Sequence, residues 1–295
     1  MTIIIFDRKG DFLDCRSLSQ SRLPIIPLRS EEQQIAMLQP VSGLQATAFA
    51  IGMVAMLASH LSLIASRRLM LETLLPSYQR RRPKETWPTL SEWIETIEKI
   101  RVTSTSRLGQ YREAVLYALG SLNLELGNVV NYAASDFFDK VFETDGCLVI
   151  SSSGLSAEAA SILASLYINW IFERRGLPGA DMTRPVVFVL DDALSLVRGS
   201  LSSDAEGSSV NPLSSWAFLG RSRGIGFIVS AQNFSLMSPA LTLNARTVLS
   251  FGSYGRDAED LGRFMNLNTE QRTHILLRGC ARKQHDTLAK MPRPN

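Results

Sequence analysis

"RPVVFVLDDALSLV", residues 184–197, is the stretch that decides the fold. A run of apolar residues, mostly β-branched, leads directly into two carboxylates, Asp191 and Asp192. Such a run is typical of a buried strand. In a parallel sheet it would deliver Asp191 to the carboxyl edge, where α/β proteins bind their ligands. The alternative is a strand followed by a helix that an Asp caps. The stretch therefore predicts a strand and leaves the role of the carboxylates open.

Further apolar runs on both sides of this strand alternate with helical segments. They are "TIIIF", "LPIIPL", "GCLVIS", "GIGFIVSAQ" and "RTVLSFG", and the tail "QHDTLAKMP" is read as a last edge strand. Strands separated by helices indicate a mostly parallel α/β sheet flanked by helices. No strand signal appears in residues 31–142, so this block is predicted to be an all-helical insertion. The expected organisation is a first part of the core in 1–30, the insertion in 31–142 and the remainder of the core in 143–295.

The insertion contains two informative helical patterns. "PTLSEWIETIEKI" has the spacing of a capping box, Thr89 with Glu92, ahead of apolar residues at helical intervals. "ATAFAIGMVAMLA", residues 46–58, is apolar throughout. A membrane-spanning helix needs about 20 such residues, so a buried core helix is the preferred interpretation. The basic run Arg80–Arg82 with Lys84 is interpreted as a solvated helix end, with phosphate binding as the alternative.

Charged and amide side chains also lie next to the ends of two other predicted strands. "FDRKGD" places Asp7, Lys9 and Asp11 around a glycine at the end of the first strand. "GRSRGIGFIVSAQN" places Arg221 and Arg223 before a buried strand. The same strand ends at Gln232, whose amide can orient a water or sense a phosphate. Each pattern alone also describes a charged surface loop.

The composition sets limits on the chemistry. A net charge of +3 does not by itself argue for nucleic acid, although Arg outnumbers Lys by 25 to six. Three scattered cysteines form no zinc or disulfide framework, which fits a reducing cytoplasmic interior. A phosphate-binding loop needs Gly-x-x-x-x-Gly-Lys-Ser/Thr, and none of the six lysines follows a glycine. The sequence therefore has an acidic, metal-type pattern without a phosphate cradle.

Taken in order, these segments resemble the HerA/FtsK-type DNA-pumping ATPases, especially the conjugative coupling proteins and HerA-like helicases. "IIIFDRKGD" is similar to the strand that follows their phosphate-loop helix, and "WPTLSEWIETI" to a helix of their helical insertion. "VFVLDDA" resembles their Walker B strand, "RSRGIGFIVSAQN" their sensor strand, and "LNARTVLSFGSYGRDAEDLGRFMNLNTEQ" their closing segment. The resemblance covers nearly the whole chain, and it implies a RecA-like core that would bind ATP and Mg²⁺.

The resemblance also implies roles for individual residues. Asp191 would hold Mg²⁺, Asp192 would stand in for the catalytic Glu, and Gln232 would be the sensor. Arg221 or Arg223 would reach a neighbouring subunit's nucleotide, while Asp7, Lys9 and Asp11 would lie at the nucleotide. Asp192 is one methylene shorter than the usual Glu, and a displacement of about 1.5 Å can cost on the order of a hundredfold in rate. Ala231 stands where the family usually has Thr.

The phosphate-loop strand of this fold has no counterpart in the 295 residues. It is expected to be central, between the Walker B and sensor strands, so its loss would leave two apolar strand edges unpaired. Three explanations follow: a fragment of a longer product, a loop supplied by another polypeptide, or a protein that lost nucleotide binding and paired the two strands directly.

The expected function is therefore a motor-type ATPase module of a DNA translocase or conjugative coupling protein, a fragment or nucleotide-incompetent alone. The expected partners are DNA and either a homo-hexameric ring or an intact P-loop subunit, together with membrane-associated secretion machinery. The expected location is the cytoplasm or the periphery of the inner membrane. The alternative is a degenerate, non-hydrolysing scaffold or adaptor of a DNA-transfer or defence assembly, and a third interpretation is a nucleic-acid-binding module.

Overall fold

The computed structural model describes residues 1–12, 24–29, 32–79, 86–192, 212–250, 253–278 and 288–290. The basic run at 80–84, considered above for phosphate binding, lies outside these residues. The chain forms two compact units. The first comprises Met1–Asp191 with Leu219–Ser230, and the second comprises Asp192–Phe218 with Ala231–Asn295.

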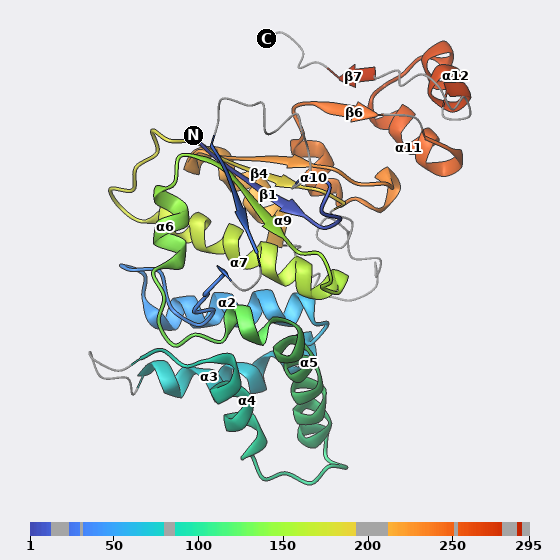
Figure 1. Cartoon of the computed structure of the whole chain (residues 1–295). Coiled ribbons are helices and arrows are strands. Elements are labelled where there is room, and N and C mark those ends of the chain that lie inside the picture. The colour runs from blue at the N-terminus through green and yellow to red at the C-terminus, as the bar shows by residue number, and fades with distance from the viewer. Residues whose placement is uncertain are drawn as a thin grey trace. The chain divides into compact units, whose positions relative to one another are not determined.

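The first unit is built on a five-stranded sheet in the order β2-β3-β1-β4-β5 (Figure 1). All four pairings are parallel. The strands are β1 (Thr2–Asp7), β2 (Ile25–Leu28), β3 (Gly146–Ser151), β4 (Val186–Leu190) and β5 (Ile225–Val229). The mostly parallel sheet flanked by helices that the sequence predicts is confirmed.

The observed strand order agrees with the direct pairing named in the third explanation above, and not with a gap between the two strands. The Walker B-like strand β4 and the sensor-like strand β5 were expected to flank a gap, but they pair directly from Val186↔Ile225 to Leu190↔Val229. Both strands are five residues long and apolar, so direct pairing satisfies the facing backbone groups along their full length. The two edges expected to be unpaired between them therefore do not exist.

The core of the first unit is aromatic where the sheet meets helix α7 (Ala157–Gly176). Phe6 of β1 meets Tyr167 of α7 edge-on, with ring centroids 5.4 Å apart, and Phe188 of β4 stacks on Phe227 of β5. Ser156 caps α7 by accepting a hydrogen bond from the Ala159 amide. Figure 1 shows α7 lying along one face of the sheet. This packing fixes the central strands and hence the position of their carboxyl ends.

The segment between β2 and β3 is helical. It contains α2 (Ala46–His60), the 3₁₀ turn η2 (Ile64–Ser66), α3 (Arg67–Gln79), α4 (Leu90–Glu98), α5 (Arg107–Val130) and α6 (Phe137–Glu143). Helix α2 is the buried core helix predicted from its composition, and it packs on α7 and α3. No helix in the described part of the chain has the length and apolarity that crossing a membrane requires.

The capping box predicted at the start of α4 is present. The Thr89 hydroxyl oxygen accepts a hydrogen bond from the Glu92 amide at 3.2 Å, and the Glu92 carboxylate accepts one from the Thr89 amide at 2.8 Å. The helix then buries Trp93 and Ile97 completely or nearly so. The cap therefore sets the direction in which α4 presents its apolar face.

Replacing Thr89 with Ala should lower the free energy of unfolding by about 1 kcal/mol, because the substitution leaves an amide of the first helical turn without its cap. Urea denaturation followed by circular dichroism measures this loss. Thr105→Ala, at an exposed threonine outside any helix, is the control and should change the stability by less than about 0.5 kcal/mol. Equal losses in the two variants would contradict a capping role.

The second unit contains shorter elements. They are η4 (Phe234–Leu236), α10 (Pro239–Asn244), β6 (Val248–Ser250), α11 (Gly255–Phe264), α12 (Thr269–Arg278) and β7 (Leu288–Lys290), with most of α9 (Pro212–Gly220). The strand predicted in "RTVLSFG" is β6, but it does not extend the parallel sheet. It pairs antiparallel with β7, because the tail of the chain offers a partner for its backbone groups.

Candidate functional site

Two of the candidate carboxylates lie at one edge of the parallel sheet. Phe6 of β1 is in register with Leu190 of β4, so Asp7 and Asp191 follow at corresponding positions on neighbouring strands. Neighbouring strands are about 4.8 Å apart, which places these two residues side by side at the carboxyl edge. The structure therefore brings Asp7 and Asp191 together, as the parallel-sheet argument predicted.

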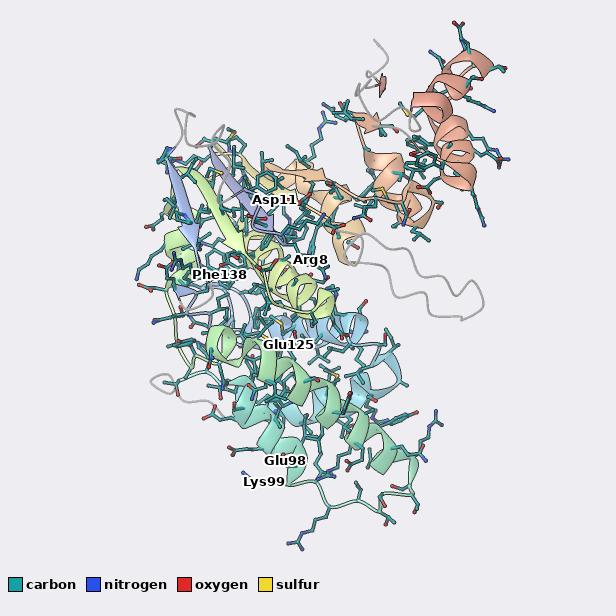
Figure 2. The ribbon with its side chains drawn as sticks, turned by 45° about the vertical axis from the view of Figure 1, so that its right-hand side comes forward. Arg8, Asp11, Glu98, Lys99, Glu125 and Phe138 are labelled. Carbon is teal, nitrogen blue, oxygen red and sulfur yellow. The ribbon has the colours of Figure 1, made fainter. Side chains whose placement is uncertain are left out.

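The Asp7 side chain organises the loop that follows β1. It is completely buried, and its two carboxylate oxygens accept hydrogen bonds from the Gly10 amide at 2.8 Å and the Phe12 amide at 3.0 Å. Gly10 has a φ of +83°, which glycine adopts without strain. Lys9 and Asp11 are exposed on this loop, where Figure 2 labels Asp11. Asp7 thus positions the loop, and Lys9 and Asp11 are the side chains that the loop presents to solvent.

The second unit begins with a polar pair. Asp192 has a φ of +47°, a left-handed conformation that Asp adopts more readily than most residues. Its carboxylate accepts a hydrogen bond from the Gln232 side-chain amide at 3.1 Å. Forty residues separate the two in sequence, yet the residues nominated as catalytic carboxylate and sensor are in direct contact. In this arrangement the amide orients the carboxylate.

The two candidate arginines lie at the opposite end of β5. Residues Arg221–Arg223 form the 3₁₀ turn η3, directly before β5 begins. Arg223 donates to the Phe172 carbonyl at 2.5 Å and its guanidinium lies 3.7 Å from the centroid of the Phe172 ring. Arg223 is therefore engaged with α7, whereas Arg221 is exposed. The structure does not bring either arginine to Asp7 and Asp191 of the same chain.

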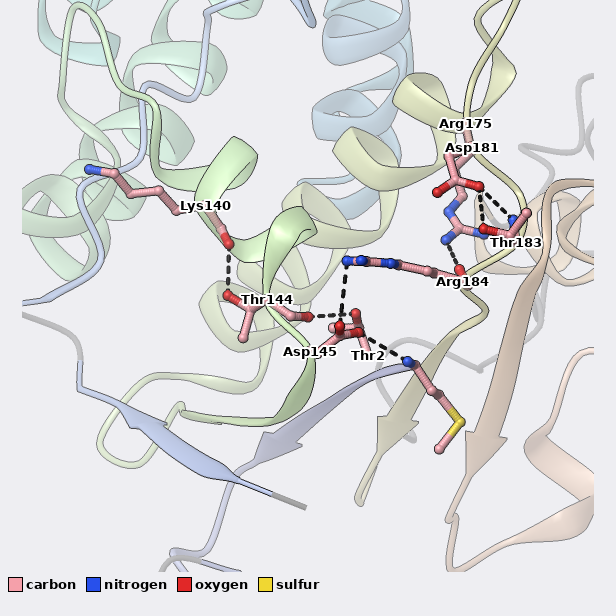
Figure 3. A network of polar contacts seen from close by, with 9 residues as sticks. Thr2, Lys140, Thr144, Asp145, Arg175, Asp181, Thr183 and Arg184 are labelled. Atoms are coloured by element: carbon pink, nitrogen blue, oxygen red, sulfur yellow. Dashed lines mark hydrogen bonds and ion pairs between the residues drawn. The ribbon is translucent and has the colours of Figure 1, made fainter. Parts of the chain in front are cut away.

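A buried arginine that the sequence did not reveal holds this turn. Arg175, at the end of α7, is 1% exposed and donates to the carbonyls of Arg223 at 2.9 Å, Gly224 at 3.1 Å and Arg184. Figure 3 shows Arg175 with Arg184 and Asp181 near the amino ends of the strands. Burial lowers the pKa of the Arg175 guanidinium, and Asp181 opposes this effect. In sequence, a basic residue at a helix C-terminus is typical of a solvated partner of the helix dipole.

A cavity of about 480 Å³ lies away from this sheet edge, between α3 and α4. Its polar lining is satisfied internally: the Trp93 indole donates to the Thr73 hydroxyl at 2.9 Å, and Lys99 pairs with Glu95 at 3.7 Å. It therefore does not compete with the sheet edge as the candidate site.

Comparison with known proteins finds similarity in structure alone. No protein-family model matches the chain, and no curated protein does. VirB4 of Thermoanaerobacter pseudethanolicus superimposes with a TM-score of 0.64 at 16% identity, over 100% of this chain and 82% of that one. The chain shares the fold of VirB4. The bacterial conjugative coupling protein TrwB follows, with a TM-score of 0.58 at 15% identity, over 90% of this chain and 65% of TrwB.

The likeness extends to a nucleotide-bound structure. TrwB in complex with ADP and Mg²⁺ matches with a TM-score of 0.57 at 16% identity, over 88% of this chain and 66% of that one. The parallel α/β fold expected from the ordered motifs is thus the fold of VirB4 and TrwB. The chain spans about two thirds of TrwB.

In this VirB4-like fold, Asp191 is the residue that could hold a magnesium ion. Mg²⁺ in nucleotide sites usually binds one or two carboxylates and completes its shell with water and phosphate oxygens. Asp191 is half-buried at the sheet edge, so its carboxylate fits this role. The described residues contain no group of three or more His, Cys, Asp or Glu that would form an all-protein metal cage. When bound, Mg²⁺ would neutralise phosphate charge; the chain's contribution is one positioned carboxylate.

Proposed function

We propose that this chain is an ATPase-type module of a conjugative or type IV secretion machine that supplies the acidic side of a nucleotide site. The observation that carries the proposal is the placement of Asp191 beside Asp7 at the carboxyl edge of a sheet whose fold matches VirB4 along the whole chain. In this proposal Asp191 holds Mg²⁺. Asp192, whose carboxylate accepts a hydrogen bond from the Gln232 amide, stands in for the catalytic Glu, and Gln232 is the sensor. Arg221, exposed at the other end of β5, acts on the nucleotide of a neighbouring subunit.

The proposal includes a dependence on residues outside this sequence. Backbone amides and a lysine of the phosphate loop normally bind the β- and γ-phosphates, and the 295 residues contain no such motif. The chain alone is therefore nucleotide-incompetent, and ATP, Mg²⁺ and DNA are ligands of the assembly in which it works. The loop lies either in a part of the same product beyond these 295 residues or in an intact P-loop subunit.

The Asp192–Gln232 contact favours a second candidate function. The hydrogen bond at 3.1 Å occupies part of the carboxylate that would activate water, and Ala231 lacks the hydroxyl usual at that position. A degenerate, non-hydrolysing scaffold or adaptor of the same kind of machine would tolerate both features. The two candidates differ in whether the assembly needs Asp191 for ATP hydrolysis.

Filter binding with labelled ATP and Mg²⁺ tests the first part of the proposal. The purified chain should show no saturable binding at micromolar nucleotide, because it lacks the loop that provides most of the phosphate contacts. Saturable micromolar binding by the chain alone would contradict its proposed dependence on another segment.

ATP hydrolysis by the assembly isolated with the tagged chain tests the second part. Asp191→Asn should lower the hydrolysis rate by at least about 10- to 100-fold, which is already the cost of losing an outer-shell partner of a metal site. Glu98→Gln, at an exposed carboxylate of α4, is the control and should leave the rate within about twofold. An unchanged rate in Asp191→Asn would support the scaffold instead.

A further inference from the structure

Helix α5 of the insertion presents apolar side chains to solvent. Among the residues that the structure describes, no large apolar side chain is more exposed than Leu124 at 89% and Tyr117 at 80%. They lie seven residues apart on this one helix, which is two turns, so they share a face. Exposed apolar side chains that gather on one face mark an interaction surface. The outward face of α5, at the side of the helical insertion in Figure 1, is therefore a candidate interface.

The residues of this face have the spacing of a contact between two helices. Exposed, uncharged residues follow one another at alternating intervals of four and three: Gln110, Ala114, Tyr117, Ser121, Leu124 and Asn128. Such intervals direct a stripe of side chains toward a partner helix. The opposite face of α5 already packs within the chain, where Val115, Leu119 and Leu126 are buried. The exposed stripe, here called the α5 seam, is therefore a second contact face on the same helix.

We propose that the α5 seam packs against the α5 seam of a second copy of this chain, antiparallel and about a two-fold axis. A two-fold contact is self-complementary, so each residue meets a different residue of the other copy. With the axis at the level of residue 119, each large side chain faces a small one and each amide faces an amide: Leu124 with Ala114, Tyr117 with Ser121, and Gln110 with Asn128. Alternation of large and small residues across facing positions allows the two helices to interdigitate.

The charges beside the seam fit the same register. Glu125 of one copy comes next to Tyr111 of the other, and the Arg107 guanidinium lies 5.4 Å from the centroid of the Tyr111 ring in its own chain. The carboxylate of one copy therefore approaches a cation of the other at both ends of the seam. Glu113, on the other side of the seam, is paired within its own chain with Arg112 at 2.5 Å. The pairing thus brings opposite charges together across the contact.

The size of the seam predicts a weak dimer. From Gln110 to Asn128 it is about 27 Å long at 1.5 Å per residue. A single pair of helices is smaller than a standard interface of about 1,600 Å², so we expect dissociation in the micromolar range or above. Gly120, beside the seam, has open space where a β-carbon would lie, which allows the two helices to approach closely. A two-fold contact closes after two copies, unlike the head-to-tail contacts of a ring, so the inference goes beyond the proposed function and does not depend on it.

Sedimentation equilibrium of the purified chain, from micromolar to millimolar concentration, tests the proposal. The wild type should pass from monomer to dimer. Leu124→Lys should weaken the dimer at least about tenfold, because the two-fold axis removes two buried leucines at once. Thr96→Lys is the control: it adds the same charge to α4, at an exposed residue that lines the cavity on the α3 side. It should dimerise like the wild type.

A pair of charges tests the register. Ala114→Glu alone should weaken the dimer, because it brings a carboxylate against Leu124 of the other copy. The double variant Ala114→Glu with Leu124→Lys should dimerise more tightly than either single variant, since each lysine then faces a glutamate across the axis. Within one chain the two positions are about 15 Å apart along the helix and cannot pair. Independent effects would instead add and make the double variant the weakest.

The outcomes distinguish the possible occupants of the seam. Dimerisation that Leu124→Lys weakens and the double variant recovers supports the proposal. A chain that stays monomeric at millimolar concentration would overturn it, as would a dimer that Leu124→Lys leaves unchanged, because the copies would then meet elsewhere. Circular dichroism must show that the variants are folded; if Leu124→Lys is not, Ala114→Glu tests the same contact from its other side. ATP hydrolysis by the assembly is unaffected by these outcomes, so failure here leaves the proposed function standing.

Discussion

Replacing Arg175 with Met is expected to lower the free energy of unfolding by about 3 to 5 kcal/mol, the usual cost of removing one partner from a buried, charged hydrogen-bond network. Met keeps much of the side-chain volume. The loss of stability therefore comes mainly from the hydrogen bonds that Arg175 donates to three backbone carbonyls. Those carbonyls belong to Arg223 in η3, to Gly224 directly before β5 and to Arg184, two residues before β4. The substitution therefore acts on the amino ends of two neighbouring strands at once.

The geometry around Arg175 explains why a rearrangement of neighbouring residues cannot easily replace the hydrogen bonds that the substitution removes. Gly224 has a φ of +64°, and a β-carbon at that position would lie 2.6 Å from an Arg175 guanidinium nitrogen. The Arg175 Nε atom is buried without a hydrogen-bond partner, so the site already carries one unsatisfied group. Urea denaturation measures the effect, with Arg174→Met, at the partly exposed preceding residue, as the control. A loss below about 1 kcal/mol for Arg175→Met would show that the carbonyls find other partners.

The second large effect is a loss of stability in acid that depends on His60. The His60 Nε2 atom lies 2.8 Å from the Ser165 hydroxyl, which joins α2 to α7. Burial lowers the pKa of His60 from 6.5 to about 4. Below pH 6.5 the unfolded chain therefore binds a proton that the folded chain excludes. Stability due to neutral His60 is complete above pH 6.5 and is lost as the pH falls toward 4, by about 3 kcal/mol in total.

Comparison with His60→Gln isolates this contribution. Gln keeps a hydrogen-bonding group for Ser165 but does not titrate, whereas carboxylates elsewhere titrate equally in both proteins. The free energy of unfolding should therefore fall more steeply between pH 6.5 and 4 in the wild type than in His60→Gln. Urea denaturation at half-unit pH intervals gives both curves. Parallel curves would mean that water reaches His60 in the folded protein.

The sequence predicted the elements of the sheet because each one has a strong local signal. β3 and β4 are apolar runs bounded by turn residues, and α4 begins at a capping box that involves only residues four positions apart or fewer. Parallel-sheet geometry then placed Asp7 and Asp191 at one edge from sequence alone. The Asp192–Gln232 contact was not predicted, because it joins residues that follow two different strands, and Gln232 lies three residues beyond the end of β5.

The strand order could not be predicted in the same way. Whether β4 and β5 are neighbours depends on pairing between segments about forty residues apart, and no periodicity in either segment encodes its partner. The role of Arg175 could not be predicted either, because its three acceptors are the carbonyls of residues 184, 223 and 224, which come near it only in the folded chain. Asp7 shows a third limit: its residue type suggested a ligand, whereas its burial makes it a loop anchor.

The central position of β1 has a consequence for synthesis on the ribosome. Its two neighbours in the sheet, β3 and β4, end at residues 151 and 190, so "TIIIF" emerges long before either can shield it. At about 5 to 20 residues per second, that interval is roughly 7 to 30 s for β3 and roughly 10 to 40 s for β4. During this interval an unpaired apolar strand is exposed near the exit of the ribosomal tunnel. Synthesis of this chain should therefore depend on chaperones that bind unfolded segments more than synthesis of a protein whose strands pair with neighbours in sequence.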